Sequence, residues 1–249
     1  MTNKALLIVE RPWSSLSDSP QQCSVLPFFQ SMERMGELIS VYYTSFFERE
    51  GFRAALNHLM GHNHKRAILY VAAHGDGIHL TGNDGAPNLR LTTALAEVFA
   101  HAKVTKNLDG VIVGSCFLGT NEATIEALFE GTGLRWVVAY QAAVEWLPSM
   151  LVDMKIVSHM ACLEEKEFCC RAAMIEAFAE ALSLFNPVCE MAEDEDEERV
   201  QLKDAVRIWI RSAGKGNHRV YEITDEVAVS AWGFATNDQD ESSTEFEAA

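Results

Sequence analysis

Two short apolar segments, each followed directly by a reactive side chain, constrain the fold of this chain most strongly. Residues 66–73 lead into His74-Gly75, and residues 109–115 lead into Cys116. Both segments are rich in apolar and β-branched residues and are predicted to be buried strands. Parallel strands of an α/β sheet end at one edge, where ligands bind. If the two strands are neighbours, the imidazole and the thiol meet in one cleft, as a cysteine nucleophile and its base require.

Strand-like and helix-like patterns alternate along the chain. Strands are predicted at 5–9, 39–43, 66–73, 109–115 and 136–144, and helices at 28–38, 48–59, 91–102 and 121–130, with Thr120 or Asn121 as the cap of the last. The glycine-rich stretch 75–85 predicts a small hairpin or loop. This alternation predicts an α/β fold with a mostly parallel central sheet covered on both faces. Beyond Pro148 we predict a C-terminal helical region, with helices at 149–159, 165–184 and 200–211, and a late edge strand at 219–223.

The size of the chain fits one large domain. It has 249 residues, of which 48% are hydrophobic. We expect a single domain at 1–235, with a helical elaboration at about 147–213, and an acidic, disordered tail at 236–249. No apolar run approaches the roughly 18 residues of a membrane-spanning helix. The run 5–9 is too short for a secretion signal, so we expect a cytoplasmic protein that does not bind a membrane.

The net charge of −16 is concentrated in two places. Seven acidic residues lie between 190 and 198 and five between 238 and 247, and without these twelve the charge is −4. No basic surface for direct nucleic-acid binding is therefore predicted, and the acidic run 193–198 is interpreted as a solvated loop. No CxxC spacing occurs, which predicts reduced thiols for the six cysteines, Cys23, Cys116, Cys162, Cys169, Cys170 and Cys189.

His74 and Cys116 are the candidate catalytic residues. A neutral imidazole can take the thiol proton and later return it to a leaving amine. Gly75 has no Cβ, so its N–H can approach a reacting carbonyl and form an oxyanion hole with the N–H of Cys116. The place of Cys116 before a helix predicts partial exposure and a stabilised thiolate. The simpler interpretations are a strand-ending histidine at a glycine turn and a buried structural thiol.

The order of these motifs resembles the caspase-like cysteine peptidases. That group includes caspases, metacaspases, gingipains, separase and the bacterial CHAT domains, and the CHAT branch is the most similar. The shared features are a strand ending in His74-Gly75, a glycine-rich hairpin, a helix, a strand ending in Gly114-Ser115-Cys116, a further strand and an alanine-rich helical region, over residues 66 to about 185. The cysteine is not in a QACRG-type signature, and the 42-residue separation is shorter than the roughly 50 of caspases, so aspartate specificity is not implied.

The resemblance implies a caspase-like three-layer sandwich and a cysteine endopeptidase with a Cys116–His74 dyad, without a third catalytic residue, metal or cofactor. It implies a protein substrate, an activating protein partner, and an effector role in bacterial defence or signalling. In CHAT-type relatives, the strand after the cysteine carries an acidic residue and a tryptophan near the substrate side-chain pocket. Glu145 and Trp146 match these positions, and a carboxylate at Glu145 would pair with Arg or Lys before the cut. Asp76 would line the cleft or orient a loop.

Three alternatives remain open. The first is a non-catalytic interaction module with the same fold. The second is a flavodoxin-like domain, although Glu10-Arg11-Pro12-Trp13 stands where a phosphate-binding glycine turn is needed. The third is a zinc hydrolase, although no CxxC or HExxH motif is present; its candidate ligands would be His62, His64, His74, His79 and Asp76.

Overall fold

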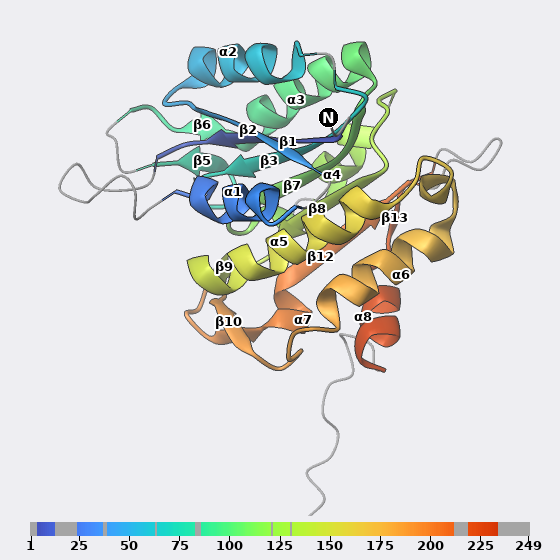
Figure 1. Cartoon of the computed structure of the whole chain (residues 1–249). Coiled ribbons are helices and arrows are strands. Elements are labelled where there is room, and N and C mark those ends of the chain that lie inside the picture. The colour runs from blue at the N-terminus through green and yellow to red at the C-terminus, as the bar shows by residue number, and fades with distance from the viewer. Residues whose placement is uncertain are drawn as a thin grey trace, which may run out of the picture.

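The central element of the protein is a seven-stranded sheet. The computed structural model describes residues 4–12, 24–36, 39–62, 64–82, 86–120, 122–129, 131–211 and 219–233. Across the sheet the strands follow the order β13 (Tyr221–Glu222), β12 (Val206–Ile210), β8 (Trp136–Tyr140), β7 (Leu108–Gly114), β3 (Arg66–Ala72), β1 (Lys4–Glu10) and β2 (Ser40–Ser45) (Figure 1). The five strands from β8 to β2 are parallel, β12 runs antiparallel to β8, and β13 runs antiparallel to β12. The mostly parallel sheet predicted from the sequence is confirmed.

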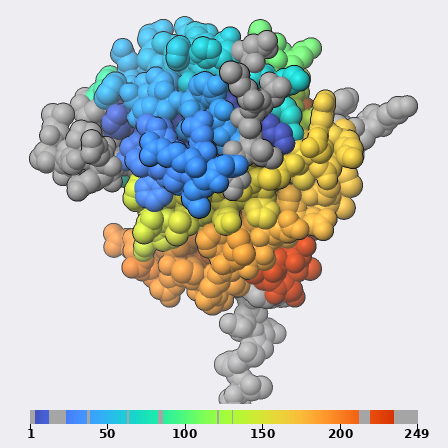
Figure 2. Space-filling model, in the orientation of Figure 1, coloured from blue at the N-terminus to red at the C-terminus, as the bar shows by residue number. Residues whose placement is uncertain are grey.

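Helices cover both faces of this sheet, which makes the three-layer sandwich that the alternation predicts (Figure 1). One face packs against α2 (Arg49–Met60), α3 (Leu91–Thr105) and α4 (Glu122–Phe129). The other face packs against α1 (Leu26–Arg34), α5 (Trp146–Cys162), α6 (Arg171–Leu182) and α8 (Thr224–Trp232). On the surface, the start of α5 (yellow-green) lies between α1 (blue) and the segment around residue 195 (orange) (Figure 2). The sheet thus separates two apolar cores.

Burial on both faces explains why the strands have nearly continuous apolar sequences. In β3, Leu69 and Val71 belong to the core under α2 and α3, whereas Ile68 and Tyr70 belong to the core under α1 and α5. Strands buried on both faces need apolar residues at every position, because successive side chains point to opposite sides. Such segments therefore lack the alternation of a half-exposed strand.

Two small antiparallel sheets extend from the carboxyl edge of the large one. The first contains β4 (His74–Gly75), β5 (His79–Thr81) and β6 (Leu89–Arg90). It accounts for the predicted glycine-rich hairpin, of which residues 83–85 lie outside the described part. The second contains β9 (Ala143–Val144), β10 (Glu190–Glu193) and β11 (Arg199–Gln201). Each small sheet begins where one of the large parallel strands, β3 or β8, ends.

The prediction of a helix at 200–211 is wrong. A single turn, α7 (Leu202–Ala205), is followed by β12, which pairs antiparallel with β8. The sequence Val206-Arg-Ile-Trp-Ile210 is dominated by β-branched and aromatic residues, which pack well on a sheet. The helical elaboration expected at 147–213 therefore also contains β10, β11 and β12, and the helix predicted at 165–184 is divided into η3 (Glu167–Cys169) and α6.

Some expectations concern residues outside the described part: the cap Asn121, the thiol of Cys23 and the tail 236–249. In the ranges that are described, five cysteines are free thiols, namely Cys116, Cys162, Cys169, Cys170 and Cys189. None of the described helices combines the length and the apolar character needed to cross a membrane.

A carboxylate is buried in the core between the sheet and α5. Asp153 has no exposed surface, and its two oxygens accept hydrogen bonds from Tyr70 (2.6 Å) and Tyr140 (2.7 Å). Burial raises the pKa of Asp153 to about 7, although the two hydroxyl groups counteract this effect. The folded protein therefore holds a proton on this side chain over a pH range in which the unfolded chain does not.

This raised pKa predicts a pH-dependent contribution to stability. The unfolded carboxyl titrates near pH 4, so the contribution is present below pH 4 and is lost as the pH rises towards 7. Between these limits the wild type should lose a few kcal/mol of unfolding free energy relative to Asp153→Asn, which has no titrating group. Urea unfolding of both proteins at several pH values measures the difference. Parallel stability curves would contradict the assignment.

Candidate active site

The register between β3 and β7 brings the two candidate residues to one place. The strands are neighbours in the sheet and run parallel, with Ala72 opposite Gly114. His74 and Cys116 therefore each stand two residues beyond the same paired position. The sequence could not show that the two strands are neighbours, and the sheet order supplies this condition.

Gly75 is in direct contact with the backbone of Cys116. A Cβ at Gly75 would lie 2.6 Å from the carbonyl oxygen and 2.9 Å from the nitrogen of Cys116, so only glycine fits. The backbone N–H of Gly75 acts on the Cys116 sulfur and favours the thiolate. Gly75 is thus packed against the cysteine.

The Cys116 thiol lies where three backbone segments converge. The backbone N–H groups of Val144, Gly75 and Cys116 itself act on the sulfur and favour the thiolate. Val144 belongs to β9, which follows β8, the other neighbour of β7. The sequence did not identify Val144, because a strand predicted without a break at 136–144 conceals the two-residue bend that redirects the chain at this point.

The predicted stabilised thiolate is wrong for this structure. Cys116 is half-buried, as predicted, but burial raises its pKa, and the three N–H groups that favour the thiolate do not compensate. No α-helix starts at Cys116. Phe117 adopts a left-handed conformation (φ 61°), and the 3₁₀ turn η2 (Leu118–Thr120) precedes α4. The helix terminus invoked in the prediction is therefore several residues away.

His74 combines accessibility with a lowered pKa. Its side chain is exposed, yet the protein around it removes part of its hydration, and this desolvation lowers the pKa. The backbone of His74 is held opposite Thr81 in the β4–β5 pair. At neutral pH the ring is uncharged, which is the form that can accept a proton.

A buried arginine supports the hairpin that follows His74. Arg11, at the end of β1, donates hydrogen bonds to the carbonyl oxygens of Leu80 (3.0 Å), Ala86 (2.9 Å) and Pro87 (3.2 Å). These carbonyls lie in β5 and in the segment that leads to β6. The contact attaches the hairpin to the large sheet.

Asp76 holds the turn of this hairpin. Its Oδ1 accepts hydrogen bonds from the N–H groups of Ile78 (2.9 Å) and His79 (2.6 Å), and its Oδ2 lies 3.1 Å from Nδ1 of His79. Partial burial acts to raise the pKa of Asp76, but these hydrogen bonds outweigh it and lower the pKa. Asp76 is expected either to line the cleft or to orient a loop, and these contacts correspond to the second role.

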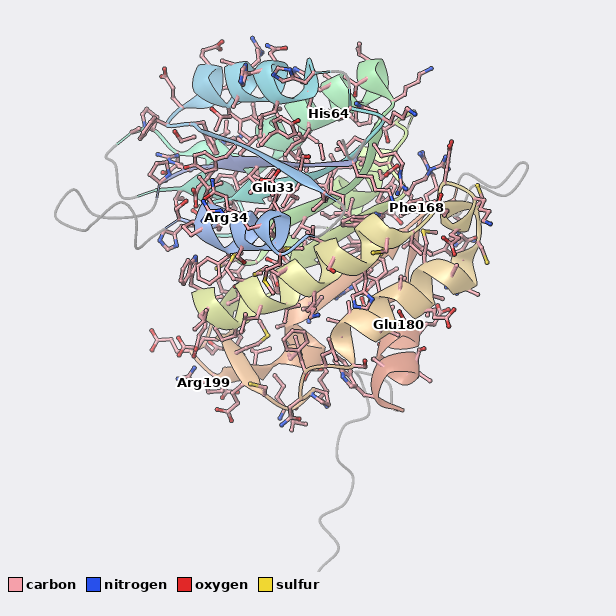
Figure 3. All side chains as sticks on the ribbon, viewed as in Figure 1. Glu33, Arg34, His64, Phe168, Glu180 and Arg199 are labelled. Carbon is pink, nitrogen blue, oxygen red and sulfur yellow. The ribbon has the colours of Figure 1, made fainter. Side chains whose placement is uncertain are left out.

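Glu145 follows Val144 and immediately precedes α5. Its half-exposed carboxylate forms an ion pair with Arg199 of β11 (2.7 Å). Arg199 is labelled in Figure 3. Arg199 also lies 3.5 Å from Glu193. Trp146 is half-buried, and its ring packs edge-on against Phe28 at 4.9 Å. The glutamate is therefore available at the surface, whereas the tryptophan has a packing contact with α1.

The histidines of the zinc alternative are not gathered in one place. His62 and His64 precede β3, whereas His74 and His79 follow it. A strand of seven residues, about 23 Å long, separates the two pairs. Within the described ranges, no group of three or more His, Cys, Asp and Glu side chains could hold a metal ion.

The raised thiol pKa leads to a prediction for the reactivity of Cys116. Only the thiolate is alkylated, so the rate at Cys116 should rise with pH to a midpoint above the ordinary thiol range. Iodoacetamide labelling from pH 6 to 10, quantified for each cysteine by mass spectrometry, measures this midpoint. Cys162, an exposed thiol, is the internal reference. A midpoint of Cys116 below that of Cys162 would show that its environment favours the thiolate.

No protein-family profile matches the sequence, and no curated protein matches it. Among solved structures, the chain is similar to a secreted C11 cysteine protease from Bacteroides thetaiotaomicron, determined in complex with an irreversible peptide inhibitor. The TM-score is 0.50 at 10% sequence identity, and the similarity covers 84% of this chain and 66% of that protein. The chain thus spans just under two thirds of that protein's length. At this identity the likeness concerns the fold, and it supports the caspase-like α/β architecture.

Proposed function

We propose that the protein is a cysteine endopeptidase of the caspase-like, CHAT type that uses Cys116 and His74 as a dyad. One observation supports the proposal above all others: His74-Gly75 and Cys116 follow neighbouring parallel strands at the same level, with Gly75 against the cysteine. The likeness in fold to a C11 cysteine protease agrees with it.

The charge states in the site indicate general-base catalysis. With the thiol pKa raised and the imidazole pKa lowered, both groups are neutral at pH 7. His74 takes the proton of Cys116 as the sulfur attacks the scissile carbonyl. The backbone N–H groups of Gly75 and Cys116 stabilise the oxyanion of the tetrahedral intermediate. No third residue is required, because the two strands themselves hold the pair together.

The intermediate collapses when the C–N bond breaks and the imidazolium of His74 gives its proton to the leaving amine. The product of this step is a thioester between Cys116 and the acyl part of the substrate. Water, deprotonated by His74, then attacks the thioester. The C–S bond breaks, the carboxylic acid leaves, and the thiol recovers its proton.

We further propose that cleavage follows a basic residue, held by Glu145. The backbone of Val144, the residue before Glu145, acts on the sulfur of Cys116, so Glu145 directly follows a residue beside the reacting centre. An exposed carboxylate suits the guanidinium of arginine or the ammonium of lysine. In this structure the carboxylate of Glu145 is already paired with Arg199. Exposed ion pairs are weak, so a substrate side chain can displace it.

The biological role that we propose is an effector in bacterial defence or signalling, which cleaves one specific protein and is activated by a protein partner. The resemblance to CHAT domains supports this role. The neutral thiol and the occupied Glu145 agree with a form that awaits activation.

The same neutral thiol also favours a second candidate, a non-catalytic interaction module with this fold. A reactive-thiol probe separates the two candidates. Labelling of Cys116 that depends on His74 supports the enzyme, whereas equal labelling of all cysteines, independent of His74, supports the module.

The dyad predicts that Cys116→Ala and His74→Ala each abolish peptide cleavage while the protein remains folded. Without the sulfur no acyl-enzyme forms, and without the imidazole no base activates the thiol. A peptide library with basic residues at the cleaved position provides the assay, and circular dichroism checks the fold. Matched controls are Cys189→Ala and His58→Ala, which change exposed residues of the same types. Cleavage that persists in both dyad variants would remove the assignment.

The specificity proposal predicts opposite effects at the two members of the Glu145–Arg199 pair. Glu145→Gln should raise KM for peptides with Arg or Lys before the cut by about tenfold, because an opposite charge is lost. Arg199→Ala should lower KM, because a competing cation is removed. Glu193→Gln, which changes the other carboxylate near Arg199, is the control and should leave KM nearly unchanged. An unaltered KM in Glu145→Gln would exclude Glu145 from substrate recognition.

A further inference from the structure

The buried carboxylate of Asp153 joins the two strands on either side of the cysteine-bearing strand. Tyr70 belongs to β3 and Tyr140 to β8, and β7 lies between them in the sheet. Tyr70 donates to Oδ2 at 2.6 Å, and Tyr140 donates to Oδ1 at 2.7 Å. One side chain of α5 therefore spans three adjacent strands near the edge at which the candidate dyad stands.

The last residue of β7 is packed against this cluster. A Cβ at Gly114 would lie 2.8 Å from Cζ of Tyr70, so a larger residue would displace the tyrosine ring. Gly114 is two residues from Cys116, and Tyr70 is four residues from His74. Any shift of the tyrosine is therefore transmitted over a short length of strand to both members of the dyad.

The cluster also lies within electrostatic reach of the Cys116 sulfur. Burial, and then the charge of Asp153, raise the pKa of Tyr140, and the charge of Cys116 contributes to the same shift. On the other side, Glu10 of β1 acts on Tyr70 in addition to Asp153. In a core of low dielectric constant such interactions are weakly screened. The Tyr140 hydroxyl and the Cys116 sulfur therefore lie close enough to influence one another.

Packing alone does not account for an acid at this position. Removal of a carboxylate from water is unfavourable unless hydrogen bonds compensate, and an apolar side chain often stabilises a core at least as well. The neighbouring α5 residues Met150, Val152 and Ile156 are apolar and fully packed. The acid thus occurs where apolar residues are the rule, bonded to the two strands that flank β7.

We propose that Asp153, with Tyr70 and Tyr140, is a positioning residue that keeps the ends of β3 and β7 aligned and so sets the surroundings of Cys116. This inference deepens the proposed peptidase function and depends on it where peptide turnover is concerned. Alkylation of Cys116 reports on the surroundings of the thiol without any substrate, so the two proposals can fail separately.

The test uses Tyr70→Phe, Tyr140→Phe and Asp153→Asn in the full chain. Each tyrosine variant removes one hydrogen bond to Asp153 and retains the ring. In all three variants the hydrogen bonds that link β3 and β8 across β7 are weakened or altered, so the surroundings of Cys116 change. The pH midpoint of its alkylation should shift by about half a unit, which is about a threefold change in the alkylation rate on the acidic side. Peptide turnover should show kcat lowered by about 10- to 100-fold, with little change in KM, because the dyad is misaligned after binding.

Tyr43→Phe is the matched control. Tyr43 of β2 donates a hydrogen bond to Glu10, the other buried carboxylate that contacts a strand tyrosine. The change removes the same type of bond from the same sheet, but β1 and β3 separate β2 from β7. We expect Tyr43→Phe to lower stability and to leave the Cys116 midpoint and kcat unchanged.

The outcomes are distinct. If Tyr70→Phe and Tyr140→Phe fold and retain both the wild-type midpoint and kcat, the cluster has no positioning role and the inference is overturned. If Asp153→Asn does not fold, the two tyrosine variants decide. If the wild type cleaves no peptide, the peptidase proposal fails, and the alkylation midpoints alone decide whether the cluster acts on Cys116.

Discussion

The parallel pairing of β3 with β7 is the constraint on which the candidate site depends. Seven residues of each strand are held by the sheet, and the last paired positions, Ala72 and Gly114, stand opposite one another. The imidazole and the thiol need no common loop, because the sheet supplies their alignment. Gly75 and Gly114 have no side chains where the two strand ends and Tyr70 come closest. These two glycines allow the backbone of one strand end to approach its neighbours closely at a crowded edge.

The sequence predicted the features that depend on local pattern and missed those that depend on tertiary contacts. Continuous apolar runs identified β3 and β7, and the reactive residues after them indicated the edge of the sheet. The pattern at 200–211 was ambiguous, because one turn of helix and a strand adjoin without a glycine or proline between them. The partners of Glu145 and Asp76 could not be predicted either: Arg199 comes from a distant hairpin, and the turn at Asp76 depends on backbone geometry. Asp153 left a weak signal, a single acid among apolar residues of a helix.

Burial governs the electrostatics of the site more than ion pairing does. It raises the pKa of Cys116 and lowers that of His74, so that both groups are neutral near pH 7. It also raises the pKa of Asp153 to about 7. Three groups close to one edge of the sheet thus prefer their uncharged forms. If the proposed function holds, binding of a peptide, which changes their hydration, alters this balance at the candidate dyad.

The antiparallel pairing of β12 with β8 determines the order in which this sheet can be completed during synthesis. β8 ends at Tyr140, but its outer neighbour begins only at Val206. Until the ribosome has produced that distant segment, β8 presents an open row of backbone donors and acceptors to other chains. Completion of the sheet on this side of β8 therefore requires contacts between residues far apart in the polymer, which makes it intrinsically slow. Nascent or truncated chains that end before residue 206 would expose this open edge to strand-mediated association.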